Sequence, residues 1–143
     1  MQRKWIIALI LASFSYVAFA DEERLVGTWI GNDRASQAIY NTIEITKNEI
    51  SWGGHRPHNP YCKTTYTIVS KKTGETYPDN VRTIQGKTFT IFKLKLVSTN
   101  CTENHGYFQF ALSSDDYAEV VPYDKDNLSL GWHNFSKLPK GTK

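Results

Sequence analysis

The chain has 143 residues, the usual length of one domain, with 17 Lys and Arg residues against 14 Asp and Glu residues. The first twenty residues hold two of the basic residues and no acidic one, so the net charge of +3 falls to +1 without them. This near balance excludes electrostatic binding of nucleic acid as a leading function.

Those first twenty residues have the layout of a secretory signal peptide. Arg3 and Lys4 precede an apolar run from Trp5 to Phe14, and Ala18-Phe19-Ala20 is a small-x-small cleavage site. The run is too short to span a bilayer. We therefore expect cleavage after Ala20, export to the periplasm or the extracellular space, and a single domain over residues 21–143.

The remaining chain alternates apolar and polar residues with the period of two that is typical of strands, and Gly, Asn, Asp and Pro separate the alternating stretches. No helical stripe is found. In chain order, the predicted strands are Leu25–Gly31, Gln37–Thr46, Glu49–Trp52, Lys63–Ser70, Thr88–Val97, Tyr107–Leu112, Tyr117–Tyr123 and Leu128–Phe135. They predict an all-β domain in which Lys71–Lys87 is one long connection.

Two of these strands form the clearest predicted hairpin. With Lys47-Asn48 as a two-residue turn, Ile45 faces Ile50 and Ile43 faces Trp52, so that all four apolar side chains share one face.

The stretch Thr88–Val97 changes phase, because Phe89 and Ile91 share one face whereas Phe92 and the leucines after it share the other. Either a bulge near Ile91–Phe92 or a strand that is apolar on both faces explains this pattern.

Cys62 and Cys101 are the two cysteines of the chain, and a lone pair in an exported protein favours a disulfide over free thiols or a thiolate metal site. If consecutive strands run up and down, both residues lie at the same end of the sheet. Closing this loop of 39 residues should stabilise the fold by about 4 kcal/mol in the chain-entropy model.

Two short motifs resemble those of the lipocalin or calycin family. Gly27-Thr28-Trp29 lies at the first predicted strand, and Asp116-Tyr117 lies between the sixth and seventh. Where that family has an arginine packed over the Trp, only Lys137 or Lys140 is available, and lysine lacks the planar stacking of arginine. The resemblance implies an eight-stranded antiparallel up-and-down β-barrel in which Trp29 closes one end. A β-sandwich is the alternative.

The resemblance also implies an open mouth at the other end, built from the loops that hold most of the histidines. The candidate rim residues for a ligand or a protein partner are His55, Arg56, His58, Tyr61, His105 and Arg34. The candidate interior residues are Trp29, Trp52, Tyr66, Phe108, Phe110 and Trp132. Side chains that simply fill the interior are the alternative to a ligand cavity.

These features favour a non-catalytic protein that binds a small, partly apolar molecule. The alternative is a module that inhibits or masks a secreted protein through the same rim, and a minor alternative is a Zn or Cu site formed by His55, His58 and His105. No cofactor is otherwise expected, and no nucleophile elbow, phosphate loop or His-Glu helix indicates an enzyme. His133 is predicted to point outward, because Leu130 and Trp132 share the inward parity.

Overall fold

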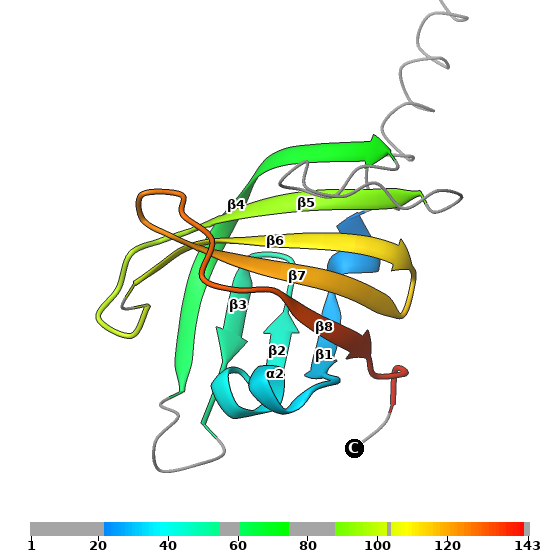
Figure 1. Cartoon of the computed structure of the whole chain (residues 1–143), viewed down its shortest axis with the longest axis horizontal. Helices are drawn as coiled ribbons and strands as arrows, with labels where there is room; N and C mark the ends of the chain where they lie inside the picture. Colours follow the sequence, from blue (N-terminus) through cyan, green and yellow to red (C-terminus); the bar gives the residue numbers. More distant parts are fainter. Residues whose placement is uncertain (1–21, 55–60, 75–87, 103, 142–143) are drawn as a thin grey trace, which may run out of the picture.

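The protein is described here by a computed structural model that places residues 22–54, 61–74, 88–102 and 104–141. Eight strands of these residues form one closed antiparallel barrel, in which sequence neighbours pair and the last strand pairs with the first (Figure 1). The strands are β1 (Gly27–Gly31), β2 (Thr42–Ile45), β3 (Glu49–Trp52), β4 (Cys62–Gly74), β5 (Phe89–Leu96), β6 (His105–Ser114), β7 (Tyr117–Asp124) and β8 (His133–Lys137). The predicted up-and-down barrel is confirmed, and its closure excludes the sandwich.

Several predictions fall on residues that the structure does not describe. These are the signal peptide at residues 1–20, the rim residues His55, Arg56 and His58, and most of the connection 71–87. Among the described residues, no helix combines the length and the apolar character needed to cross a membrane.

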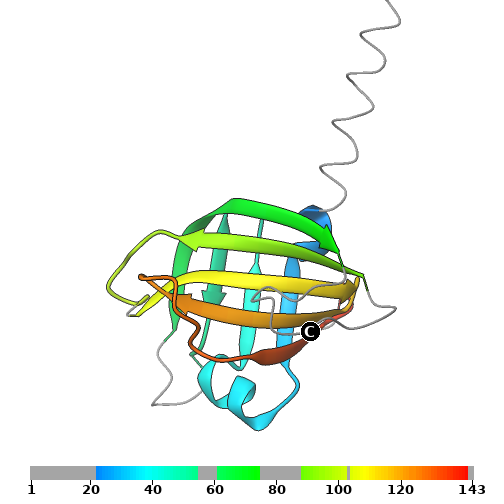
Figure 2. The ribbon, with the colours of Figure 1, turned by 45° about the horizontal axis from the view of Figure 1, so that its top comes forward.

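The barrel wall is uneven in height. β1, β2 and β3 have five, four and four residues, whereas β4 and β6 have 13 and 10. β4 pairs with β3 as far as Thr65, and from Tyr66 onward the strand that pairs with it among the described residues is β5. Figure 2 shows the long strands β4–β7 crossing over the short strands β1–β3. One end of the barrel is therefore less enclosed on the side formed by the short strands β1–β3.

Large apolar side chains alternate along the strands and fill the interior, as the period of two requires. The most deeply buried ones, each 2 % exposed or less, include Trp29, Ile43, Ile45, Ile50, Phe92, Leu94, Phe108, Phe110, Leu112 and Phe135. The predicted hairpin is confirmed: Ile43 pairs with Trp52 and Ile45 with Ile50.

The predicted strand Gln37–Thr46 is wrong in its first half, where the chain forms the short helix α2 (Arg34–Ile39). Asp33 caps this helix, since its carboxylate accepts a hydrogen bond of 2.8 Å from the backbone N–H of Ser36. The helix ends before Asn41, whose φ of 56° turns the chain into β2. Local capping chemistry therefore outweighs the apolar alternation at this point.

The predicted strand Leu128–Phe135 is wrong in its first half as well. The segment 125–132 folds back along β7, where the N–H of Leu130 donates to the carbonyl of Pro122 at 2.8 Å. Gly131 follows with a φ of 145°, and β8 begins only at His133.

This irregular segment reverses the predicted orientation of three side chains. His133 pairs with Val120 on the inner face and is 5 % exposed, whereas Leu130 and Trp132 are 41 % and 37 % exposed. The indole N–H of Trp132 donates to Glu119, which lies on the outer face of β7. Trp132 is therefore not an interior residue, and His133 does not point outward.

The phase change in β5 is explained by a strand that is apolar on both faces. β5 keeps a continuous register with β6 from Thr90 to Lys95, so the bulge expected near Ile91–Phe92 is wrong. The register shift lies instead in the neighbouring strand, between Ile68 and Ser70 of β4. On the outer face, the buried side chains Phe89, Ile91 and Ala111 form a second apolar cluster.

Candidate functional site

The two ends of the barrel differ in what closes them. We call the end that holds α2 and the β3–β4, β5–β6 and β7–β8 connections the capped end. We call the opposite end, which holds residues 22–25 and the β2–β3 turn, the open end.

Aromatic side chains fill the capped end, where the sequence predicted a mouth. Tyr40, which follows α2, is 2 % exposed, and its ring packs edge-on against Phe108 with centroids 5.7 Å apart. The Tyr40 hydroxyl lies 2.7 Å from Nε2 of His105. That imidazole in turn contacts the rings of both Trp52 and Phe108, at centroid distances of 5.5 and 5.6 Å. These contacts fill the described part of the capped end with packed rings.

A polar cluster continues the cap on the α2 side. The hydroxyl of Ser36, which is fully buried, donates to Asp33 Oδ2 at 2.7 Å and lies 3.1 Å from Nδ1 of His133. In a catalytic triad the imidazole lies between carboxylate and hydroxyl, whereas here the hydroxyl lies between the other two groups. The cluster therefore joins α2 to β8 and presents no exposed nucleophile.

Burial lowers the pKa of His133 below its ordinary value, and the nearby carboxylate of Asp33 opposes this only in part. The hydrogen bonds from the Ser36 backbone and side chain lower the pKa of Asp33. At neutral pH the cluster therefore holds an ionised carboxylate and a neutral imidazole.

We expect the stability of the fold to fall as the pH decreases below about 6.5, the ordinary pKa of histidine. In this range an unfolded chain takes up a proton at residue 133, whereas the buried imidazole of His133 does not until the pH is lower. Urea unfolding at several pH values between neutral and mildly acidic measures the effect. His133→Asn keeps a polar group near Ser36 without the titration and should reduce the slope of stability against pH. An unchanged slope in that variant would contradict this assignment.

The three described rim residues have different surroundings. His105 belongs to the aromatic cap, and Arg34 is exposed at the start of α2. Tyr61 is 57 % exposed and lines an outer groove of about 320 Å³ together with Glu44, Ser51 and Gly54.

The histidine metal site remains a prediction. His105 is described and has the contacts given above, whereas His55 and His58 lie outside the described residues. In the part of the chain that the structure places, no three His, Cys, Asp or Glu side chains are grouped as metal ligands.

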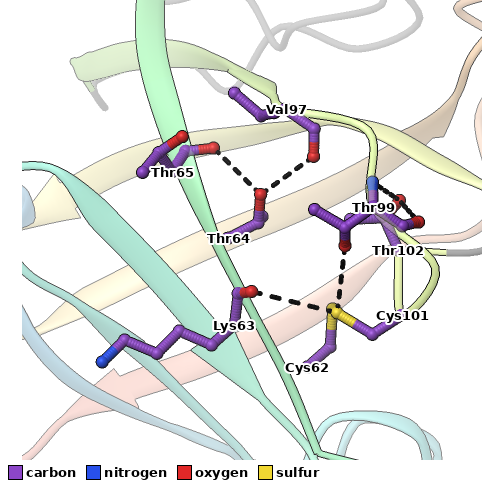
Figure 3. Close-up of a disulfide and its surroundings, with 8 residues drawn as sticks. All are labelled: Cys62, Lys63, Thr64, Thr65, Val97, Thr99, Cys101 and Thr102. Atoms are coloured by element: carbon purple, nitrogen blue, oxygen red, sulfur yellow. Dashed lines mark hydrogen bonds between the residues drawn. A yellow bond between two sulfur atoms is a disulfide. The ribbon is translucent and has the colours of Figure 1, made fainter.

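The predicted disulfide is confirmed, and it ties two elements of the capped end together (Figure 3). Cys62 begins β4, Cys101 lies in the β5–β6 connection, and their Cα atoms are 5.2 Å apart. Beside the bridge, the hydroxyl of Thr64 donates to the carbonyl of Val97 at 2.9 Å. The capped end is therefore cross-linked covalently as well as packed.

The open end contains a cavity of about 490 Å³. It lies where the short hairpin β2–β3 ends and β4 continues beyond it, with no strand of the described residues paired on that side. Tyr66 and Ile68 therefore lie at the edge of the interior. Its described lining consists of Glu22, Glu23, Val26, Lys47, Tyr66, Ile68 and Lys140. An apolar floor and a charged rim therefore occur together.

The helical turn at residues 22–25 closes part of the open end and is fixed from several sides. The indole N–H of Trp29 donates to the carbonyl of Leu25 at 2.9 Å. Nζ of Lys137 lies 5.4 Å from the Trp29 ring centroid and donates to the carbonyl of Arg24 at 2.8 Å. The guanidinium of Arg24 pairs with Asp115 at 2.6 Å. Lys137 thus occupies the position over Trp29 that the sequence left to one of two lysines.

Sequence reasoning named Tyr66 as an interior residue, but it placed the predicted mouth at the end of the barrel opposite this cavity. The other lining residues were not predicted as site residues, and of these Glu22, Glu23 and Lys140 flank the strands, where periodicity carries no signal. The unequal lengths of β3 and β4 decide which end is open, and those lengths depend on pairing between strands.

Comparisons with protein-family models, with curated proteins and with solved structures found no match for this chain. The fold and the geometry of the two ends are therefore the basis for its function.

Proposed function

We propose that this chain is an exported, non-catalytic binding protein that takes a small, partly apolar molecule into the cavity at the open end. The observation that carries the proposal is the cavity itself, about 490 Å³ above a floor of Val26, Tyr66 and Ile68. Small-molecule sites in proteins commonly measure about 300–1,000 Å³ and combine an apolar lining with a few polar groups. The aromatic packing of the described residues at the capped end favours this entrance over the predicted one.

The proposal includes a lipocalin-like relationship and export by the predicted signal peptide. The lipocalin-like relationship is supported by the eight-stranded closed barrel and by the side chain of Lys137, which lies over the ring of Trp29. The disulfide supports the second, since such bridges persist in oxidising compartments.

The proposal is tested with Nile red, an uncharged dye whose emission rises in apolar surroundings. Ile68→Trp would fill the floor of the cavity, and we expect it to weaken dye binding at least about tenfold, or about 1.4 kcal/mol. Val69→Trp is the matched control, because Val69 is 51 % exposed and is not among the described lining residues. Val26→Phe reduces the cavity at another lining residue, in case Ile68→Trp does not fold.

Circular dichroism and thermal unfolding establish that each variant is folded. Equal dye affinity in wild type, Ile68→Trp and Val26→Phe would place the dye outside the cavity and contradict the proposal. Absence of dye binding by the wild type would contradict it as well.

A protein partner is the second candidate, and a run of exposed apolar side chains in the β7–β8 connection favours it. Leu128, Leu130 and Trp132 lie within five residues and are 64 %, 41 % and 37 % exposed. Tryptophan is enriched in the energetic centres of protein interfaces. If Nile red binds wild type and the two cavity variants equally well but does not bind Leu128→Ser/Leu130→Ser, the result favours a protein partner over the cavity.

A further inference from the structure

The orientation of the Ser36 hydroxyl at the capped end determines which nitrogen of His133 carries the proton. A serine hydroxyl has a single proton, and Ser36 donates it to Asp33 Oδ2 at 2.7 Å. Nδ1 of His133, which lies 3.1 Å from the same hydroxyl oxygen, must therefore be the donor in that contact. Neutral His133 thus holds its proton on Nδ1 and its free electron pair on Nε2, so a further proton is added at Nε2.

The surroundings of Nε2 in His133 do not suit an added proton. Nε2 faces the backbone of Gly131, where an ideal Cβ atom would lie 3.1 Å from it. Within the described ranges Nε2 has no hydrogen-bond partner, and Val120, which pairs with His133 on the inner face, is apolar. Because His133 is buried, a cationic N–H at this position costs free energy.

The charges around His133 do not reverse this effect. Among the described residues, the charge that acts on His133 is that of Asp33, and it opposes the effect of burial only in part, so the pKa of His133 stays below its ordinary value. The ring of Tyr40 also contacts His133, at a centroid distance of 5.2 Å. Burial raises the pKa of Tyr40, so its hydroxyl is neutral in mildly acidic solution. Protonation of His133 is therefore favoured when the imidazole reaches water.

Helix α2 covers His133 and depends on its contacts with the barrel. It has six residues, and an isolated helix of this length is not stable in water. Ser36 contacts His133 of β8, Gln37 Nε2 donates to the carbonyl of Gly31 at 3.1 Å, and Tyr40, directly after the helix, is buried. Short units of this kind open locally at a lower free energy than the strands of a core. Undocking of α2 would expose His133 to water while the barrel stays closed.

We propose that α2 is a pH-sensitive lid on the capped end, which undocks when His133 takes up a proton in mildly acidic solution. Undocking would uncover Tyr40 and the rings of Phe108 and Phe135 that it contacts. The barrel interior would then have a second entrance in acid that is closed at neutral pH. This lid is independent of the proposed ligand cavity, because its residues are not among the described lining residues at the open end.

Hydrogen exchange of backbone amides tests the lid, with protection factors measured from about pH 7.5 to about pH 5, across the ordinary pKa of histidine. The reporters are Tyr40 and Asn41, whose N–H groups donate to the carbonyl of Ser36 at 2.9 and 3.1 Å. The reference amides are Phe110 and Leu112 of β6, a strand that is paired on both sides. We expect lower protection at the reporters than at the reference amides throughout. Below about pH 6.5 the protection of the reporters should fall by up to about tenfold per pH unit, the limit for uptake of one proton.

Three variants identify the group that titrates. His133→Asn cannot take up the proton and should remove the pH dependence of reporter protection. Asp33→Asn keeps a good N-cap but removes the carboxylate that favours the imidazolium, so it should move the pH dependence to lower pH. His105→Gln is the control, because His105 is the other described histidine beside Tyr40, with Nε2 2.7 Å from the hydroxyl. It should leave the pH dependence in place.

Several results would overturn the lid. Equal protection at reporters and reference amides would mean that α2 opens only when the whole barrel unfolds. Reporter protection that does not change with pH, or that keeps its pH dependence in His133→Asn, would exclude His133 as the trigger, and loss of the dependence in His105→Gln would assign it to His105. If His133→Asn does not fold, an unchanged pH dependence in Asp33→Asn contradicts the proposal. None of these results alters the Nile red test of the open-end cavity.

Discussion

Replacing Trp29 with alanine is expected to destabilise the fold by about 3–5 kcal/mol, the range for removing a large aromatic side chain from a core. Trp29 has no exposed surface, and its ring lies 6.0 Å from that of Phe110. The substitution also removes the cation–π contact between Lys137 and the indole ring, and the hydrogen bond from the indole N–H to the carbonyl of Leu25. Urea unfolding followed by circular dichroism measures the loss.

Trp29→Phe is the graded control for this prediction. It keeps most of the aromatic volume and loses the indole hydrogen bond, so its expected destabilisation is smaller, about 1–3 kcal/mol. If total stability is near the lower limit of about 5 kcal/mol for a small domain, the alanine variant will unfold and the phenylalanine variant remains measurable. Wild-type stability in both variants would show that Trp29 does not hold the open end.

Removing the disulfide should have an effect of similar size. Cys62→Ala/Cys101→Ala opens a loop of 39 residues, and the chain-entropy model assigns about 4 kcal/mol to its closure. Alanine is the suitable replacement because Cys62 is 1 % exposed and serine would bury a hydroxyl. We expect a lower denaturation midpoint in urea for the double variant.

Two measurements check this explanation of the disulfide. Wild type with the bridge reduced should unfold at the midpoint of the double variant, and Thr99→Ala, beside the bridge, should remain within about 0.5 kcal/mol of wild type. An unchanged midpoint after reduction would mean that the packing of the capped end alone fixes these two connections.

The strands that could be predicted are those in which pattern and turn agree. In the β2–β3 hairpin, the turn at Lys47-Asn48 and the apolar faces of Ile43 and Ile45 require the same register, and the structure has it. The disulfide could be predicted from the up-and-down order of the strands, because that order places both cysteines at one end of the sheet.

The parts that could not be predicted depend on interactions that a period of two does not contain. α2 depends on the cap that Asp33 provides, and the inward side chain of His133 depends on the backbone at Gly131. The position of the cavity depends on β4 continuing past the end of β3, which only the assembled sheet determines. Each error therefore arose where a local cap, a glycine or a difference in strand length replaced simple alternation.

The central claim is that ligands enter at the open end, and mapping backbone amide shifts of a ¹⁵N-labelled protein during titration with Nile red tests it most directly. We predict that the largest shifts occur at Val26, Lys47 and Ile68, with little change at Trp52 and His105 in the cap. Shifts centred on the cap, with the amides around Ile68 unmoved, would contradict the account.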